Sequence, residues 1–453
     1  MIVFKRKIYN KLLSWKEQSK GSRALLIEGA RRIGKSTIVE EFAKNEYQSY
    51  ILIDFNRASK VVLSAFNNYL NDLDTFFMIL SSEYGVKLYP RESLIVFDEI
   101  QRFPKAREAV KYLVADGRYD YIETGSLISI KENVSDITIP SEERRINMYP
   151  MDFEEFAWAL GSEQLMAYIR QCFEKKSPLD QESHAKAMML FRQYIIVGGM
   201  PQSVVAFIQN GRDFAAADTE KRDILALYRS DMMKIAASYR SGVLAIFDQL
   251  PGFLSKSERR VILSQIEKGA TFPKYHDTFF WLSDSMIANE CFNCADPNVG
   301  LSLNEDRTYV KCYMGDTGLL ISHTFDENEI ADNELYRQLL FEKLSLNEGM
   351  FFENAIAQTL VAAGHKLYFY THYNEEKHRC DIEIDFLLSN NSKLKYKLYP
   401  VEVKSSDRYG ITSLQRFNKH FHKRIGGCYV IHPKNLKVEG NITYLPAYMA
   451  FCL

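Results

Sequence analysis

The sequence predicts an α/β protein: an N-terminal domain built on a parallel sheet, a mainly helical middle region, and a second α/β domain. Over about the first 160 residues, short and almost continuously apolar segments alternate with helical stretches. This pattern is typical of parallel strands covered by helices on both faces. Apolar residues then recur at steps of three and four, the period of an amphipathic helix. Strand patterns return from about residue 345, and we place the domains at 1–160, 161–340 and 341–453.

Five segments of the N-terminal domain predict the strands of its sheet. Each is short and rich in apolar or aromatic residues, and helical stretches separate them. The candidates are Ala24–Glu28, Tyr50–Asp54, Ser93–Phe97, Tyr119–Glu123 and Arg145–Tyr149.

The middle region reads as helices followed by a small hairpin. FEEFAWAL, HAKAMMLFRQYIIV and FAAADTEKRDILALYRSDMMKIAASY carry the helical period. A further helix at Thr278–Ala288 precedes the strand-like TYVKCYMGD. The order favours a winged-helix-like lid, although an ordinary helical bundle fits the pattern equally well.

The C-terminal region returns to alternating elements. A helical FFENAIAQTLVAA is followed by strand-like KLYFYTHY, DIEIDFLL and LYPVEVK, then by a helical stretch and GGCYVIH. No Pro/Gly-rich linker separates the regions, so we expect them to pack together.

Composition excludes several classes of protein. The formal net charge is −1, which argues against a broadly basic nucleic-acid binder but leaves room for a local basic groove. No run of about 18 apolar residues predicts a membrane span, and the N-terminus lacks the apolar core of a secretory signal. The seven scattered cysteines are those of a reduced protein, so we expect a cytoplasmic location.

A phosphate-binding loop lies directly after the first predicted strand. The segment Gly29-Ala30-Arg31-Arg32-Ile33-Gly34-Lys35-Ser36 matches G-x-x-x-x-G-K-[ST] without a mismatch, and Thr37 continues it into a helix. The backbone N–H groups of such a loop and the start of the helix surround the β-phosphate of ATP. Lys35 is expected to neutralise the β- and γ-phosphate oxygens, and Ser36 to ligate Mg²⁺.

A second acidic element completes the predicted ATP site. The third strand runs into Asp98 and Glu99. Asp98 is expected to hold Mg²⁺ through water, and Glu99 to polarise the water that attacks the γ-phosphate. The fourth strand ends in Thr124-Gly125-Ser126, where Ser126 is expected to contact the γ-phosphate or the attacking water; a plain Gly-Ser turn is the alternative.

Two pairs of arginines are candidates for contact with the nucleotide. Arg144 and Arg145 precede the fifth strand, where one of them would act as an arginine finger on a neighbouring subunit's nucleotide. Arg31 and Arg32 would guard the phosphates or lie in solvent.

Several motifs along the chain together resemble those of a known family. GARRIGKST, FDEIQ, TGS, YPMDFEEF and YIIVGGMPQSV, followed by KCYMGDTGLL, GMFFENAIAQTL, EIDFLL and PVEVKSS, resemble the bacterial and archaeal AAA-type ATPases with a C-terminal domain of unknown function. The resemblance covers nearly the whole chain. It implies an AAA-type P-loop core, a winged-helix-like middle, and a restriction-endonuclease-like end domain similar to PD-(D/E)xK nucleases. Such proteins often carry Gly-Arg before the fifth strand, and the SEERRINMYP of this chain lacks that glycine.

The residues of the C-terminal strands fit a nuclease-like centre. Asp385 and Glu402 end two strands and could hold a divalent metal between them. Lys404 shares the strand face of Glu402 and would orient or activate a water. Glu353, on the preceding helix, would complete the site. A solvated face of alternating charges is the alternative.

The function predicted from the sequence is ATP hydrolysis with Mg²⁺, coupled to a nuclease-like domain that acts on DNA. The alternative is an ATPase switch whose inactive end domain binds a protein or DNA partner. A homo-oligomer is required if an arginine acts in trans. A small-molecule kinase is disfavoured, because Glu99 suits water activation and no acceptor-binding motif is present.

Overall fold

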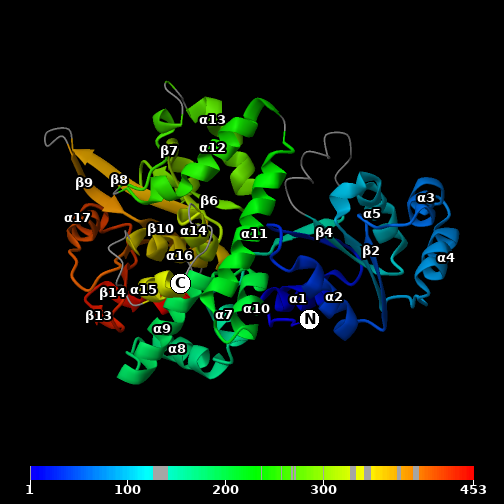
Figure 1. Ribbon diagram of the computed structural model, residues 1–453, viewed down its shortest axis with the longest axis horizontal. Coiled ribbons are helices and arrows are strands. Elements are labelled where there is room, and N and C mark those ends of the chain that lie inside the picture. Colours follow the sequence, from blue (N-terminus) through cyan, green and yellow to red (C-terminus); the bar gives the residue numbers. More distant parts are fainter. Residues whose placement is uncertain are drawn as a thin grey trace. The chain divides into compact units, whose positions relative to one another are not determined.

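The computed structural model describes residues 2–125, 141–235, 237–256, 258–266, 269, 272–298, 300–326, 333–340, 348–374, 379–390 and 397–453. These residues form two compact units, Met1–Tyr149 and Pro150–Leu453, here called unit 1 and unit 2. Figure 1 shows both units and labels many of their elements. Each unit is described by itself.

Unit 1 is built on five parallel strands in the order β2-β3-β4-β1-β5. This confirms the predicted parallel sheet core. The fourth and fifth strands differ from the prediction by one or two residues at their ends. The bounds are β1 Ala24–Glu28, β2 Ser49–Asp54, β3 Ser93–Asp98, β4 Asp120–Gly125 and β5 Glu143–Asn147.

Helices pack against the sheet of unit 1 because its strands are apolar on both sides. One apolar core joins side chains of β1 to β4 with those of α3 (Lys60–Asn68), α4 (Leu73–Tyr84) and α5 (Pro104–Asp116). Helix α2 (Lys35–Glu46) contacts β2, β3 and β4, and packs on α1 (Ile8–Ser19). The strand order brings the carboxyl ends of β1, β3 and β4 to one edge, where ligands of open parallel sheets bind.

Unit 2 combines helices with two sheets, ordered β7-β6-β8-β9 and β10-β11-β12-β14-β13. Its helices are α7 Phe153–Ala159, α8 Glu163–Lys175, α9 Gln181–Val197, α10 Pro201–Gln209, α11 Phe214–Met232, α12 Ala237–Leu254, α13 Phe272–Asp284, α14 Thr317–Thr324, α15 Asn333–Leu340, α16 Glu348–Ala362 and α17 Thr412–Phe421. Its strands are β6 Ala288–Cys294, β7 Glu305–Met314, β8 Leu367–Asn374, β9 Arg379–Ile384, β10 Phe386–Asn390, β11 Lys397–Val403, β12 Cys428–His432, β13 Lys437–Glu439 and β14 Ile442–Pro446.

The predicted boundary near residue 340 lies inside unit 2. The expected hairpin of the middle region is β6 paired antiparallel with β7. Strand β6 also pairs in parallel with β8, which comes after the predicted boundary, at Cys291–Leu367, Phe292–Tyr368 and Asn293–Phe369. The middle and C-terminal regions therefore share a sheet, which is closer packing than the sequence indicated.

The motifs of unit 2 that carry the family resemblance form a buried polar junction. Asp316 of the GDTG segment caps α14 by accepting from the N–H of Leu319 at 3.0 Å. It also accepts from the N–H of Gly199 at 2.6 Å and from Nε2 of Gln358 at 3.1 Å. Burial raises the pKa of this carboxyl. One side chain thus links the start of α14, the Gly198-Gly199 segment and α16.

The apolar helices of the described part are not membrane spans. None of them combines sufficient length with the hydropathy needed to cross a bilayer.

Candidate nucleotide site and C-terminal polar centre

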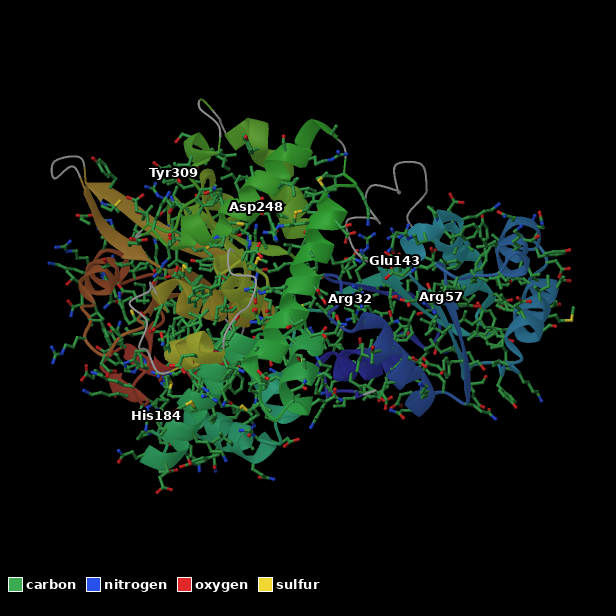
Figure 2. The ribbon with its side chains drawn as sticks, viewed as in Figure 1. Arg32, Arg57, Glu143, His184, Asp248 and Tyr309 are labelled. Atoms are coloured by element: carbon green, nitrogen blue, oxygen red, sulfur yellow. The ribbon has the colours of Figure 1, made fainter. Side chains whose placement is uncertain are left out.

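The phosphate-binding loop runs from the end of β1 to the start of α2, as predicted. Gly34 adopts a left-handed conformation with φ 91° immediately before the helix. Arg32, which is labelled in Figure 2, is also left-handed, with φ 69°, and its side chain is exposed. A Cβ on Gly29 would lie 2.5 Å from the carbonyl oxygen of Met148, so only glycine fits there. The first residue of the loop therefore packs closely against the Met148 backbone, and Arg32 and Gly34, just before α2, take left-handed conformations.

Lys35 points back into this loop. Its Nζ donates to the carbonyl oxygens of Gly29 at 2.9 Å and Ala30 at 2.8 Å. Burial lowers the pKa of Lys35 to about 8, and the nearby carboxylates of Glu99 and Asp98 partly oppose that shift. An ammonium held inside the loop is placed to meet a phosphate there.

Ser36, Asp98 and Thr124 meet at the carboxyl edge of the sheet. Ser36 Oγ donates to Asp98 Oδ1 at 2.8 Å. The hydroxyl of Thr124, near the end of β4, donates to the same oxygen. The two hydroxyls and the carboxylate offer oxygen atoms, the ligands that Mg²⁺ prefers. This arrangement suits a magnesium ion coordinated by Ser36 and reached by Asp98 through water.

Glu99 lies just past β3 in a left-handed turn, with φ 56° and ψ 45°. Its Oε2 accepts a hydrogen bond from Gln101 Nε2. A non-glycine residue with positive φ is uncommon and often marks a functional position. The turn places the carboxylate outside the strand, where its charge acts on Lys35.

Thr124 is a site residue that the sequence interpretation passed over in favour of Ser126. Both belong to the Thr-Gly-Ser segment, and because they are two residues apart, strand alternation alone does not distinguish them. Ser126 lies outside the described residues. Thr37 is half-buried on α2, and Ile33 is buried within the loop.

The two candidate arginine fingers make contacts inside unit 1. Arg144 Nη1 donates to Gln18 Oε1 at 3.0 Å. Arg145 donates to Glu143 at 2.8 Å and lies 3.8 Å from Glu28 (Glu143 is labelled in Figure 2). Both arginines are exposed, and Arg31 is half-buried beside the loop.

The C-terminal candidates come together at the ends of β9 and β11. Asp385 Oδ2 accepts from the N–H of Val403 at 2.7 Å. Glu402 Oε1 accepts from the N–H of Leu414 in the first turn of α17 at 2.8 Å. Lys404 Nζ lies 2.9 Å from Glu402 Oε2. Burial raises the pKa of Glu402, a shift that Lys404 opposes and Asp385 increases.

Glu353 is engaged by cations instead. It is buried on α16, accepts from the hydroxyl of Tyr313 at 2.6 Å, and forms an ion pair with Arg259. Lys311 Nζ, also buried, lies 3.8 Å from Glu353 and 3.3 Å from Glu383. Lys311 begins the KCYMGDTGLL segment, but nothing in that segment indicated a role for its charge, and Arg259 lies outside the motifs that carry the family resemblance. Among the described residues, no group of three or more His, Cys, Asp or Glu side chains is arranged to hold a metal.

Comparison with family models divides the chain into three parts. Residues 21–157 match an AAA domain. Residues 188–329 match a domain of unknown function (DUF8612), and residues 348–449 match a second one (DUF4143). The chain thus carries an AAA-type P-loop ATPase domain followed by two domains of unknown function.

Three solved structures show weak similarity to this chain. The Walker-type ATPase of Pyrococcus abyssi is 15% identical, with 71% of this chain and 96% of that chain covered and a TM-score of 0.41. The Aeropyrum pernix Orc1 protein in complex with DNA is 10% identical, with 75% of this chain and 93% of that chain covered and a TM-score of 0.28. AMPPCP-bound DnaA from Aquifex aeolicus is 12% identical, with 76% of this chain and 95% of that chain covered and a TM-score of 0.29. No curated protein matches.

Proposed function

We propose that unit 1 hydrolyses ATP with Mg²⁺. The observation that supports this most directly is the convergence of Ser36, Asp98 and Thr124 on one point beside the phosphate-binding loop. Ser36 and Asp98 would hold Mg²⁺, which when bound neutralises charge on the β- and γ-phosphates. These two residues fit such an ion, because the Ser36 hydroxyl and the Asp98 carboxylate offer the oxygen ligands that Mg²⁺ prefers.

Within the same site each remaining side chain has a role. Lys35 contacts the phosphate oxygens in place of the Gly29 and Ala30 carbonyls. Glu99 accepts a proton from the attacking water or orients it. Thr124 contacts the water or the γ-phosphate from the neighbouring strand, the role first assigned to Ser126.

Removal of the metal tests this proposal. The purified protein should release phosphate from ATP with Mg²⁺, and this release should stop when EDTA is present, since Ser36 and Asp98 would then lack their cation. Restoring excess Mg²⁺ should restore phosphate release. Phosphate release that continues at full rate in EDTA would contradict the magnesium role of these residues.

We further propose that nucleotide state is coupled to a nuclease-like domain at the C-terminus. The order α16, β8, β9, β10, β11, α17, β12, with Asp385 before β10, Glu402 near the end of β11 and Lys404 directly after it, supports this similarity. Helix α17 begins against Glu402 and carries exposed Arg416 and Lys419, which suit a DNA phosphate backbone. In the middle region, α12, α13 and the β6–β7 hairpin would form the winged-helix-like lid.

A second function, an ATPase switch with a non-cutting end domain, is favoured by one observation. Glu353 is already neutralised by Arg259 and Lys311, and both carboxylate oxygens of Glu402 have partners. Of the predicted C-terminal carboxylates, Asp385 and Glu402 are then left to share a divalent metal, and because Glu402 already has two partners they are a poor donor set for a catalytic ion. In this role the domain would bind DNA or a protein partner without cleaving it.

Nucleic-acid cleavage distinguishes the two roles. DNA and RNA should be incubated with the full chain and Mg²⁺ or Mn²⁺, with and without ATP, beside Asp385→Ala and Lys404→Ala. Because Glu353 is engaged by cations, we expect no cleavage that depends on these residues, and ATP hydrolysis should be unchanged in both variants. Cleavage by the parent that both variants lose would instead establish an ATP-linked nuclease.

A further inference from the structure

Arg6 belongs to no motif, yet its guanidinium contacts the phosphate-binding loop. The residue precedes α1 and is only 7% exposed. Its Nη1 donates to the carbonyl oxygen of Ile33 at 3.0 Å, and its Nη2 donates to that of Tyr149 at 2.7 Å. A charge this deep is tolerated only where acceptors surround it. These two backbone carbonyls make Arg6 a bridge between the loop and the end of unit 1.

The contact with Ile33 fixes the direction of one peptide group. The peptide between Ile33 and Gly34 is planar and trans, so its C=O and N–H point to opposite sides. Because the carbonyl faces Arg6, the N–H of Gly34 faces away from Arg6. In a loop of this motif, backbone N–H groups cradle the phosphates.

The residues around this peptide need such support. Arg32 and Gly34 have positive φ values of 69° and 91° on either side of Ile33. The left-handed conformation is unfavourable for a side chain such as that of Arg32 and persists only where its surroundings impose it. The hydrogen bond from Arg6 is one constraint that acts directly on the intervening carbonyl.

The other half of the bridge lies beside the first residue of the loop. The N–H of Met148 donates to the carbonyl oxygen of Glu28 at 2.8 Å, and its own carbonyl borders Gly29. Through Tyr149, Arg6 therefore ties the exit of the loop to the segment that lines its entry. Unit 2 begins at the next residue in the chain.

We propose that Arg6 is a positioning residue for nucleotide binding: it holds the Ile33–Gly34 peptide so that the Gly34 N–H meets the β-phosphate. The proposal rests on ATP binding at this loop. Since Arg6 touches the loop backbone and not the nucleotide, its loss should weaken ATP and ADP alike. The step that Glu99 promotes should be much less affected.

The test compares Arg6→Ala and Arg6→Lys, each made in the whole 453-residue chain, with the parent by titration of fluorescent ATP and ADP analogues and by steady-state hydrolysis. Arg6→Ala should raise Kd for both nucleotides about tenfold, the loss expected for one charged hydrogen bond, with kcat at saturating ATP within about twofold. Arg6→Lys, which keeps one cationic donor, should recover part of the affinity. Lys11→Ala, which removes a positive charge from an exposed position of α1, should match the parent.

Two outcomes would overturn the role of Arg6. One is an unchanged Kd in Arg6→Ala, with or without a fall in kcat; the other is a Kd that rises for only one of the two nucleotides. Failure of the parent itself to bind nucleotide would instead contradict the proposed function. Thermal unfolding of each variant shows whether it folds. If Arg6→Ala does not fold, the proposal requires that Arg6→Lys bind both nucleotides more weakly than the parent, and an unchanged Kd in Arg6→Lys would overturn it.

Discussion

Replacement of Lys35 by alanine should abolish measurable ATP binding. The ammonium is buried in the loop, and its loss would leave the β- and γ-phosphates without their main cationic partner. Removing one partner of a buried charge pair costs about 3 kcal/mol, or more than a hundredfold in Kd. Titration with a fluorescent ATP analogue measures the effect directly.

Lys44→Ala is the matched control for this change. Lys44 lies on the same helix and pairs at 2.7 Å with Glu40 in a largely exposed position, so its loss should leave ATP affinity unchanged. The parent offers a second readout, because the pKa of Lys35 is lowered to about 8. Only the protonated amine pairs with phosphate, so affinity should fall as pH rises through 8. Lys35→Ala binding ATP as tightly as the parent would exclude this role.

Replacement of Glu99 by glutamine should separate binding from turnover. Glutamine keeps the size of the side chain but cannot accept a proton, and a positioned general base contributes about 10²–10⁴-fold to rate. We expect ATP to bind with near-parent affinity while kcat falls at least a hundredfold. Phosphate release under single-turnover conditions, together with nucleotide titration, measures both quantities.

Glu83→Gln, on an exposed position of α4, controls for the loss of one negative charge. It should hydrolyse ATP at the parent rate. Equal turnover by Glu99→Gln and the parent would remove Glu99 from the catalytic role and direct attention to another base near Asp98.

The sequence predicted the fold of unit 1 well because local signals agreed there. An apolar β1, a glycine-rich loop and an amphipathic α2 follow one another, and each restricts its neighbour. The strand order was not predicted, because the pairing of β4 with both β1 and β3 depends on contacts distant in sequence. The same limit explains the shared sheet of unit 2, where β6 and β8 are far apart in the chain.

For the candidate site, the sequence indicated residues in a spaced motif and missed those that act across space. Ser36 and Asp98 were expected to cooperate, and the structure places them in hydrogen-bond contact. Arg6 carries no sequence signal, because an arginine outside a pattern is usually a solvated surface residue. Lys311 was also missed, since only the folded β7 shows that its ammonium lies between Glu353 and Glu383.

The pairing of β6 with β8 has a consequence for how the protein is made. While the ribosome synthesises residues 295–366, the edge of β6 that β8 later covers lacks its partner. Synthesis at about 5–20 residues per second makes that interval several seconds long. During this time an unpaired strand edge is a site for wrong association. A chain that stops near residue 340 would keep that edge permanently, so the middle region should aggregate when it is expressed without the C-terminal region.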